Sequence, residues 1–250
     1  MSQSGASFTK AMLLAAGRGT RLRPMTETIS KCMVEIAGKP ILEHNVERLR
    51  GFGVTDIVIN LHYLPEAVMN HFGDGSRFGV RILYSHEPEL LGTAGAVKKV
   101  AAFFDAPFFV WYGDNLSTCR LDRLREFHEA KGGIATLALH YREDPTQSGI
   151  VGLDEDDRVT RFLEKPCAEQ VFSHWVSAGI LALEPRALEA IAADEAVDFG
   201  RDVFPLLLEK GEAIYGYRMG EDERLWWIDT FADYQRVQAH RSTSIKGNSE

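Results

Sequence analysis

Short apolar runs alternate with amphipathic stretches along most of the chain. The runs are rich in β-branched and aromatic residues, which is typical of buried strands, and the amphipathic stretches repeat with the period of a helix. The expected strands are residues 11–15, 56–60, 80–84, 108–112 and 134–141, and the expected helices are residues 41–52, 65–72, 94–104 and 121–131. This alternation predicts an α/β fold with a mostly parallel sheet and helices on both faces.

The second half of the chain is less regular. An acidic turn at residues 154–157 lies between two apolar runs and predicts a hairpin of residues 149–153 and 158–163. The remaining expected elements are strands at 176–183 and 214–219 and helices at 185–192 and 199–210. Because no repeat or linker divides the chain, we expect one domain over residues 9–240 and a polar, disordered tail at 241–250.

The first apolar run leads directly into a glycine-rich, cationic segment. It reads Leu14-Ala15-Ala16-Gly17-Arg18-Gly19-Thr20-Arg21-Leu22-Arg23-Pro24. Glycines let the backbone N–H groups approach a ligand closely, and guanidinium groups beside them favour a polyanion. A turn that merely connects a strand to a helix is the alternative. The segment has no Gly-Lys-Ser or Gly-Lys-Thr ending, and Leu22 replaces the third glycine of a dinucleotide fingerprint.

Composition narrows the classes of partner. The net charge of −8 argues against non-specific binding of nucleic acid, although a local arginine cluster can still bind a small anion. No apolar run reaches about 18 residues, so we expect no membrane span. Cys32, Cys119 and Cys167 are far apart and in no metal-ligand pattern, which indicates reduced thiols and a cytoplasmic protein.

Further motifs follow the glycine loop. They are Lys31, Gly38-Lys39-Pro40-Ile41-Leu42, Glu87-Pro88-Glu89-Leu90-Leu91-Gly92-Thr93-Ala94-Gly95, Tyr112-Gly113-Asp114-Asn115, Phe162-Leu163-Glu164-Lys165-Pro166 and Trp227-Ile228-Asp229-Thr230. In this order they resemble the sugar-1-phosphate nucleotidyltransferase family, and the resemblance covers residues 9–240. It implies a Rossmann-like, three-layer α/β/α fold, similar to that of GT-A enzymes, with a mixed, mostly parallel central sheet.

The resemblance also implies a reaction. An oxygen of a sugar 1-phosphate attacks the α-phosphorus of a nucleoside triphosphate, and pyrophosphate leaves. Such chemistry depends on positioning and charge neutralisation rather than on a protein nucleophile. The implied catalytic cations are Arg21, Lys31 and Lys165, and the implied nucleotide-binding residues are Leu14, Ala15, Ala16, Gly17, Gly19, Thr20, Glu87, Leu91, Gly92, Thr93 and Gly113.

The family pattern differs at two places. The family usually has Pro-Lys-Pro where this chain has Ser30-Lys31-Cys32, so we expect a softer loop around the lysine. Glu164, Lys165, Ser177 and Gly179 are the implied sugar-phosphate residues. Many relatives have Asn where Ser177 stands, which points to an unusual sugar.

Asp114 and Asp229 are the implied ligands of Mg²⁺, with one ion expected and a second left open. Magnesium prefers one or two carboxylates together with phosphate oxygens and water. The alternative roles are a turn residue for Asp114 and a helix N-cap for Asp229.

Glu87 carries the prediction about the base. It occupies the position where thymidylyltransferases and many uridylyltransferases have Gln. A carboxylate only accepts hydrogen bonds, which suits the adjacent N1–H and N2–H₂ donors of guanine. We therefore favour GTP over UTP, with dTTP, CTP and ATP behind, and keep backbone recognition around Leu91 and Gly92 as the alternative. Heptose, mannose, N-acetylmuramate and cyclitol phosphates all remain open as the second substrate.

Two other functions compete with this one. A non-catalytic regulatory subunit that senses nucleotide sugars would not need both metal ligands. A glycosyltransferase typically carries Asp-x-Asp after a strand, whereas this chain has Asp114-Asn115-Leu116. We expect a nucleoside triphosphate and a sugar 1-phosphate as ligands, no nucleic acid or membrane partner, and leave a homodimer open.

Overall fold

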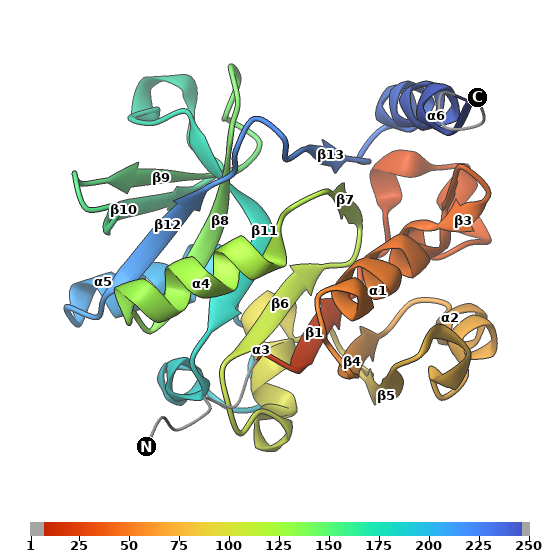
Figure 1. The fold of residues 1–250 in the computed structure, drawn as a ribbon, viewed down its shortest axis with the longest axis horizontal. Coiled ribbons are helices and arrows are strands. Elements are labelled where there is room, and N and C mark those ends of the chain that lie inside the picture. Colours follow the sequence, from red (N-terminus) through yellow and green to blue (C-terminus); the bar gives the residue numbers. More distant parts are fainter. Residues whose placement is uncertain (1–7, 247–250) are drawn as a thin grey trace.

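The computed structural model describes residues 8–246, and the side chains of residues 8–240. A nine-stranded mixed sheet forms the centre of the molecule (Figure 1). Four parallel strands at one end of this sheet lie in the order β5-β4-β1-β6. Their bounds are Lys10–Leu14 for β1, Asp56–Leu61 for β4, Arg81–His86 for β5 and Phe108–Tyr112 for β6.

Strand β11 (Trp175–Leu183) joins the two halves of the sheet, because it pairs antiparallel with β6 and also with β8 and β9. The other strands are β8 (Ala135–Tyr141), β9 (Gly149–Leu153), β10 (Val159–Glu164) and β12 (Ile214–Arg218). β9 and β10 form the predicted hairpin. The predicted α/β fold with a large, mostly parallel central sheet is confirmed. Each antiparallel pair of strands in this sheet includes β9 or β11.

Helices cover both faces of the sheet because successive strand residues point to opposite sides. Ala11 and Leu13 pack into a core beneath α1, α2 and α4, whereas Met12 faces a second core beneath α3 and α5. In Figure 1, α1 and α4 lie in front of the strands and α3 lies behind them. The bounds are Ile41–Gly51 for α1, Pro65–Phe72 for α2, Gly92–Lys99 for α3, Leu121–Lys131 for α4 and Phe204–Glu209 for α5.

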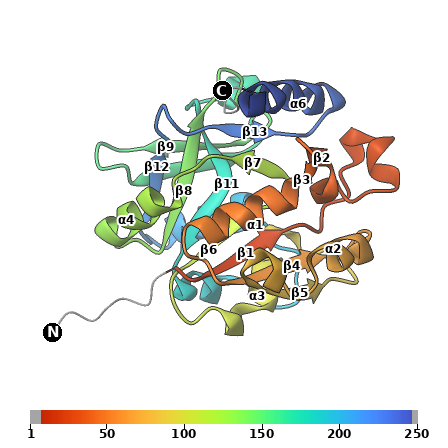
Figure 2. The ribbon, with the colours of Figure 1, turned by 45° about the vertical axis from the view of Figure 1, so that its right-hand side comes forward.

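Two small sheets were not predicted, because strands of two or three residues show no periodicity. β2 (Glu35–Ile36) pairs with β3 (Lys39–Pro40), and β7 (Asn115–Ser117) pairs with β13 (Leu225–Trp227). Helix α6 (Phe231–Lys246) packs against β13 and β2, as Figure 2 shows. The β7–β13 pair matters for function because it connects the segment after β6 to the segment that leads to Asp229.

Several predicted helices differ from those observed. Residues 185–190 form a 3₁₀ helix, and residues 101–103 form a separate 3₁₀ turn after α3. The helix expected at 199–210 divides into a π-helical segment, Phe199–Val203, and α5. Pro205 has no N–H to donate to the carbonyl of Arg201, so a continuous α-helix would lose a bond there.

The expected tail is also corrected in part. Helix α6 continues to Lys246, so residues 241–246 are helical rather than disordered. The rest of that predicted tail, residues 247–250, lies outside the described residues. None of the helices within residues 8–246 is long and apolar enough to span a bilayer.

A buried histidine ties α4 to the sheet and makes stability depend on pH. His128 is 2% exposed, its Nδ1 lies 2.8 Å from Thr136 Oγ1, and its Nε2 lies 3.4 Å from Glu184 Oε1. Burial lowers the pKa of His128 below its ordinary value of 6.5, although the Glu184 carboxylate opposes this shift. The unfolded chain therefore takes up a proton more readily, and stability falls as the pH drops below 6.5.

We expect the free energy of unfolding in urea to be about 1 kcal/mol lower at about pH 5.5 than at about pH 8. The His128→Gln variant keeps a polar group beside Thr136 but cannot titrate, so it should lose most of that difference. Burial also lowers the pKa of His140, which accounts for the part that remains. An unchanged pH dependence in the variant would contradict this role of His128.

Candidate active site

The glycine loop follows β1 and forms one wall of a cavity of about 220 Å³. Leu14, Ala15, Ala16 and Gly17, four of the residues predicted to bind the nucleotide, all line it. Gly19 and Thr20 lie further along the loop and do not line this cavity, nor the larger cavity described below that contains Lys165. Gly19 has a positive φ of 59°, and a Cβ atom there would lie 2.7 Å from Lys31 Cβ. The loop is thus packed directly against the stem of Lys31.

Two cations and two carboxylates meet in one ionic network beside the loop. Lys31 Nζ donates to Asp114 Oδ2 at 2.6 Å and to Asp229 Oδ1 at 2.7 Å. The Arg21 guanidinium also reaches Asp229 Oδ1, at 3.0 Å. Arg21 and Lys31 come from the segment after β1, and Asp114 and Asp229 come from two regions far away in the sequence, so the fold brings these four motif residues together.

Lys31 is nearly enclosed, since its side chain is only 8% exposed. Burial alone would lower the pKa of Lys31, but the two adjacent carboxylates outweigh it and the pKa is raised above 10.5. The ammonium is therefore charged at neutral pH and neutralises the carboxylates. Burial raises the pKa of the neighbouring Cys32 thiol to about 11, so Cys32 packs as a neutral side chain.

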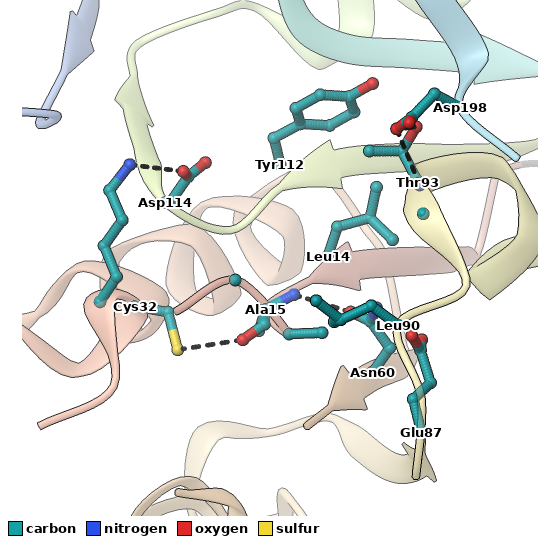
Figure 3. A pocket seen from close by; sticks show the side chains of 14 residues that line it. Leu14, Ala15, Cys32, Asn60, Glu87, Leu90, Thr93, Tyr112, Asp114 and Asp198 are labelled. Atoms are coloured by element: carbon teal, nitrogen blue, oxygen red, sulfur yellow. Dashed lines mark hydrogen bonds and ion pairs between the residues drawn. The ribbon is translucent and has the colours of Figure 1, made fainter. Parts of the chain in front are cut away.

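A chain of hydrogen bonds fixes the opposite wall of the cavity. The Ala15 N–H donates to Asn60 Oδ1 at 2.7 Å, and Asn60 Nδ2 donates to Glu87 Oε1 at 2.8 Å. Glu87 Oε2 then accepts the Leu91 N–H at 3.0 Å. Figure 3 shows Asn60, Glu87 and Leu90 on one side of the cavity, with Tyr112 and Asp114 across from them.

This chain gives Glu87 a task that differs from the predicted one. Glu87 is 1% exposed, and each of its carboxylate oxygens already accepts a hydrogen bond from the protein. The residue lies in the wall of the cavity. Its carboxylate joins the loop after β1 to the start of α3 rather than standing free to receive a guanine.

The start of α3 lies at the edge of the same cavity. Gly92 and Thr93 line it, together with Leu90 rather than the predicted Leu91. Thr93 Oγ1 donates to Asp198 Oδ1 at 3.0 Å and accepts the Phe199 N–H at 2.9 Å. Gly113 lines neither cavity, and its N–H donates to the Leu14 carbonyl at 2.8 Å. Its role is to join β6 to β1.

A second cavity of about 530 Å³ adjoins the first. The four predicted sugar-phosphate residues all line it, namely Glu164, Lys165, Ser177 and Gly179. Arg21, Asp114 and Asp229 line it as well, so the ionic network faces this cavity. Lys165 has a positive φ of 46°, which is uncommon for a residue with a side chain and is typical of functional sites. Burial raises the pKa of Glu164.

Sequence reasoning missed several residues of the site, above all Asn60, Tyr112, Asp198 and Arg201. Tyr112 and Asp198 line both cavities, together with Thr93 and Asp114, and thus mark the boundary between them. Asn60 and Tyr112 lie at the carboxyl ends of β4 and β6, where ligands gather in such sheets, so their positions carried a usable signal. Asp198 and Arg201 come from the irregular π-helical region and carried none.

Comparison with known proteins identifies a matching family model and several relatives. The family model described as nucleotidyl transferase matches residues 10–240. A UTP–glucose-1-phosphate uridylyltransferase from Synechocystis is 37% identical over 95% of this chain and 64% of its own length. A mannose-1-phosphate guanylyltransferase from Mycobacterium tuberculosis is 37% identical over 83% of this chain and 58% of its own length. The chain thus spans less than two thirds of these relatives.

Solved structures share the fold. A putative glucose-1-phosphate thymidylyltransferase from Bacillus anthracis superposes with a TM-score of 0.82 at 22% identity, covering 92% of this chain and 94% of its own. HddC from Yersinia pseudotuberculosis, complexed with GMP-PN, gives 0.76 at 24% identity, covering 93% of this chain and 99% of its own. Since the family model extends over nearly the whole described chain, the protein belongs to the nucleotidyl transferase family.

Proposed function

We propose that the protein transfers a nucleotidyl group from a nucleoside triphosphate to a sugar 1-phosphate, with release of pyrophosphate, and that GTP is the preferred donor. One observation carries this proposal. Arg21, Lys31, Asp114 and Asp229 converge where the cavity beside the glycine loop meets a second cavity that holds Lys165. A reaction between two phosphate esters requires cations at that junction, because both reactants are anionic.

The first cavity is assigned to the nucleotide. The backbone of Leu14, Ala15, Ala16 and Gly17 provides one wall, and the apolar side chain of Leu90 contributes another. A base between apolar groups and backbone amides matches the usual composition of nucleotide pockets. The triphosphate would then extend toward Arg21 and Lys31, whose charges oppose its own.

The second cavity is assigned to the sugar 1-phosphate. Lys165 lines this cavity and would bind the incoming phosphate. The Glu164 carboxylate would accept a hydrogen bond from a hydroxyl group of the sugar. Arg21 lines this cavity too, so it can face the α-phosphorus from the side of the acceptor. Holding both esters at this junction supplies the alignment that an in-line displacement needs.

Magnesium fits the two carboxylates. Asp114 Oδ2 and Asp229 Oδ1 approach one ammonium from different segments, so both are aimed at a single cationic position. No group of three or more His, Cys, Asp or Glu side chains gathers as a metal site within the described part of the chain, which suits an ion completed by phosphate oxygens and water. When bound there, Mg²⁺ would neutralise charge on the phosphates and orient them.

The preference for GTP draws support from relatives named as mannose-1-phosphate guanylyltransferases, including the M. tuberculosis enzyme and one from rice that is 38% identical over 78% of this chain. The Synechocystis uridylyltransferase, which matches 95% of this chain, favours UTP as the alternative. Both assignments share the reaction and the two cavities, and they differ only in the base.

Replacing Glu87 by Gln tests how the base is read. The backbone donors of Ala15 and Leu91 fix both ends of the hydrogen-bond chain, so both terminal atoms of the side chain at position 87 must accept, and a Gln has an accepting oxygen at only one of these two places. We expect Glu87→Gln to lower kcat/KM for GTP and for UTP by similar factors, about tenfold each. A loss confined to GTP would show that the Glu87 carboxylate contacts guanine directly.

The proposed function is tested by pyrophosphate release over a grid of five nucleoside triphosphates and a panel of sugar 1-phosphates, with Mg²⁺ and with EDTA. We expect metal-dependent release with one pair, which names both substrates. If no pair released pyrophosphate, although the protein was folded and calorimetry showed that it binds nucleotide, the proposed enzymatic activity would be contradicted. The alternative of a regulatory subunit would then be favoured.

A further inference from the structure

The position between Asp114 and Asp229 is filled by a side chain of the protein itself. Lys31 Nζ lies within hydrogen-bonding distance of both carboxylates, and the Lys31 side chain is 8% exposed. A cation that bridges two carboxylates occupies the place where a metal ion would be bound. Asp229 has a second cationic partner, Arg21, whereas within residues 8–240 Asp114 forms an ion pair with Lys31 alone.

The charges of this cluster balance without any metal. Two carboxylates face one ammonium and one guanidinium, and adding a divalent cation would place two further positive charges beside them. The ammonium must leave the place between the carboxylates before a metal ion can bind there, because two cations so close together repel each other. The ligand-free site is therefore built to bind a metal weakly.

A triphosphate changes that balance. It brings several negative charges to the glycine loop, against which the stem of Lys31 is packed. An ammonium on a flexible stem can exchange one set of anionic oxygens for another. The phosphates thus supply the Lys31 ammonium with a new partner and free both carboxylates.

We infer that Lys31 acts as a stand-in cation between Asp114 and Asp229, and that a triphosphate draws it away so that metal and nucleotide bind together. This inference rests on the magnesium role proposed above. It adds a second task to Lys31, which holds the carboxylates in place before substrate arrives and contacts phosphate afterwards. It also couples the two binding events, so that each ligand favours the other.

Direct metal binding tests the inference without any turnover. Free Mn²⁺ is measured by electron paramagnetic resonance in the absence of nucleotide, for the wild type and for Lys31→Gln. We expect Lys31→Gln to bind Mn²⁺ at least about tenfold more tightly, because two carboxylates lose the competing ammonium. Equal or weaker binding by the variant would overturn the inference.

The same variant should have the opposite effect on the affinity for a triphosphate, which should become weaker. In EDTA, we expect Lys31→Gln to bind inorganic tripolyphosphate about tenfold more weakly than the wild type by calorimetry. If the role of Lys31 were merely structural, Lys31→Gln would bind both Mn²⁺ and tripolyphosphate more weakly. Opposite effects on the metal and on the anion are therefore the signature of the stand-in cation, and parallel losses would overturn it.

Three further variants make the measurement specific. Lys39→Gln removes a lysine paired with Glu47 at 2.6 Å on the surface, and its Mn²⁺ affinity should match the wild type. Lys31→Arg keeps the positive charge and should keep Mn²⁺ binding weak, which also guards against a folding defect in Lys31→Gln. Adding Asp229→Asn to Lys31→Gln should remove the gain, which locates the ion at these carboxylates.

The outcomes separate this inference from the proposed function. Tighter Mn²⁺ binding by Lys31→Gln, together with silence over the substrate grid, would support the stand-in cation and contradict the enzyme. Metal-dependent turnover by the wild type, with no gain of Mn²⁺ affinity in Lys31→Gln, would support the enzyme and overturn the stand-in cation.

Discussion

Replacing Asp229 by asparagine is expected to lower kcat for pyrophosphate release by about a hundredfold or more, with the fold intact. Asp229 Oδ1 accepts a hydrogen bond from Lys31 at 2.7 Å and forms an ion pair with Arg21 at 3.0 Å, so this carboxylate orients the two cations closest to the proposed reacting phosphates. An amide of the same shape removes the charge that would bind Mg²⁺ and that pairs with Lys31 and Arg21.

The control for this prediction is Asp222→Asn. Asp222 forms an exposed ion pair with Arg123 at 2.9 Å and lines neither cavity, so its loss should leave kcat unchanged. Circular dichroism and the Tm of both variants establish that the fold is retained. If kcat of Asp229→Asn stayed within a few-fold of the wild type, the assignment of Asp229 to the metal would be wrong.

Replacing Gly92 by alanine is expected to reduce the free energy of unfolding by about 3 kcal/mol and to weaken nucleotide binding. Gly92 has a positive φ of 71°, and a Cβ there would lie 2.5 Å from the Val197 carbonyl oxygen. That contact is with backbone, which cannot rotate away as a flexible side chain would. The segment around Val197 also accepts the N–H groups of Ala94 and Gly95, so moving it disturbs the start of α3 beside the nucleotide cavity.

Gly51→Ala is the matched control. Gly51 ends α1 and has no positive φ, and a Cβ added there would have no atom within 4 Å, so alanine should be neutral or slightly stabilising. Urea denaturation gives the free energies, and calorimetry gives the nucleotide affinity. If Gly92→Ala and Gly51→Ala had equal free energies of unfolding, the segment around Val197 would be able to move away from the added Cβ without loss of stability.

Much of the fold was accessible from the sequence because its strands and helices are long enough to show a period. β1, β4 and β6 each form a short apolar run, and α1 and α4 carry amphipathic patterns, so the alternation emerges from local chemistry. The irregular parts escaped prediction for the opposite reason. The π-helical segment at residues 199–203 and the β7–β13 pair depend on contacts with distant chain, which leave no periodic trace.

The candidate site shows the same division. The glycine loop, Lys31, Asp114, Lys165 and Asp229 could be named from motifs, because phosphate chemistry needs backbone donors, cations and carboxylates in recognisable combinations. Which of them touch could not be named. Lys31 and Asp229 are 198 residues apart, and only the pairing of β7 with β13 and the packing of the loop bring them to 2.7 Å.

Periodicity and motif chemistry are local properties, and they were enough to predict the class of fold, the family and the chemical types of the candidate residues. The folded structure was needed to find that Glu87 is held by Asn60 and Leu91 and that Lys31 bridges the two aspartates. Hydrogen-bond partners depend on distances across the folded chain, and those distances are set by the packing of the whole sheet and its helices rather than by any segment alone.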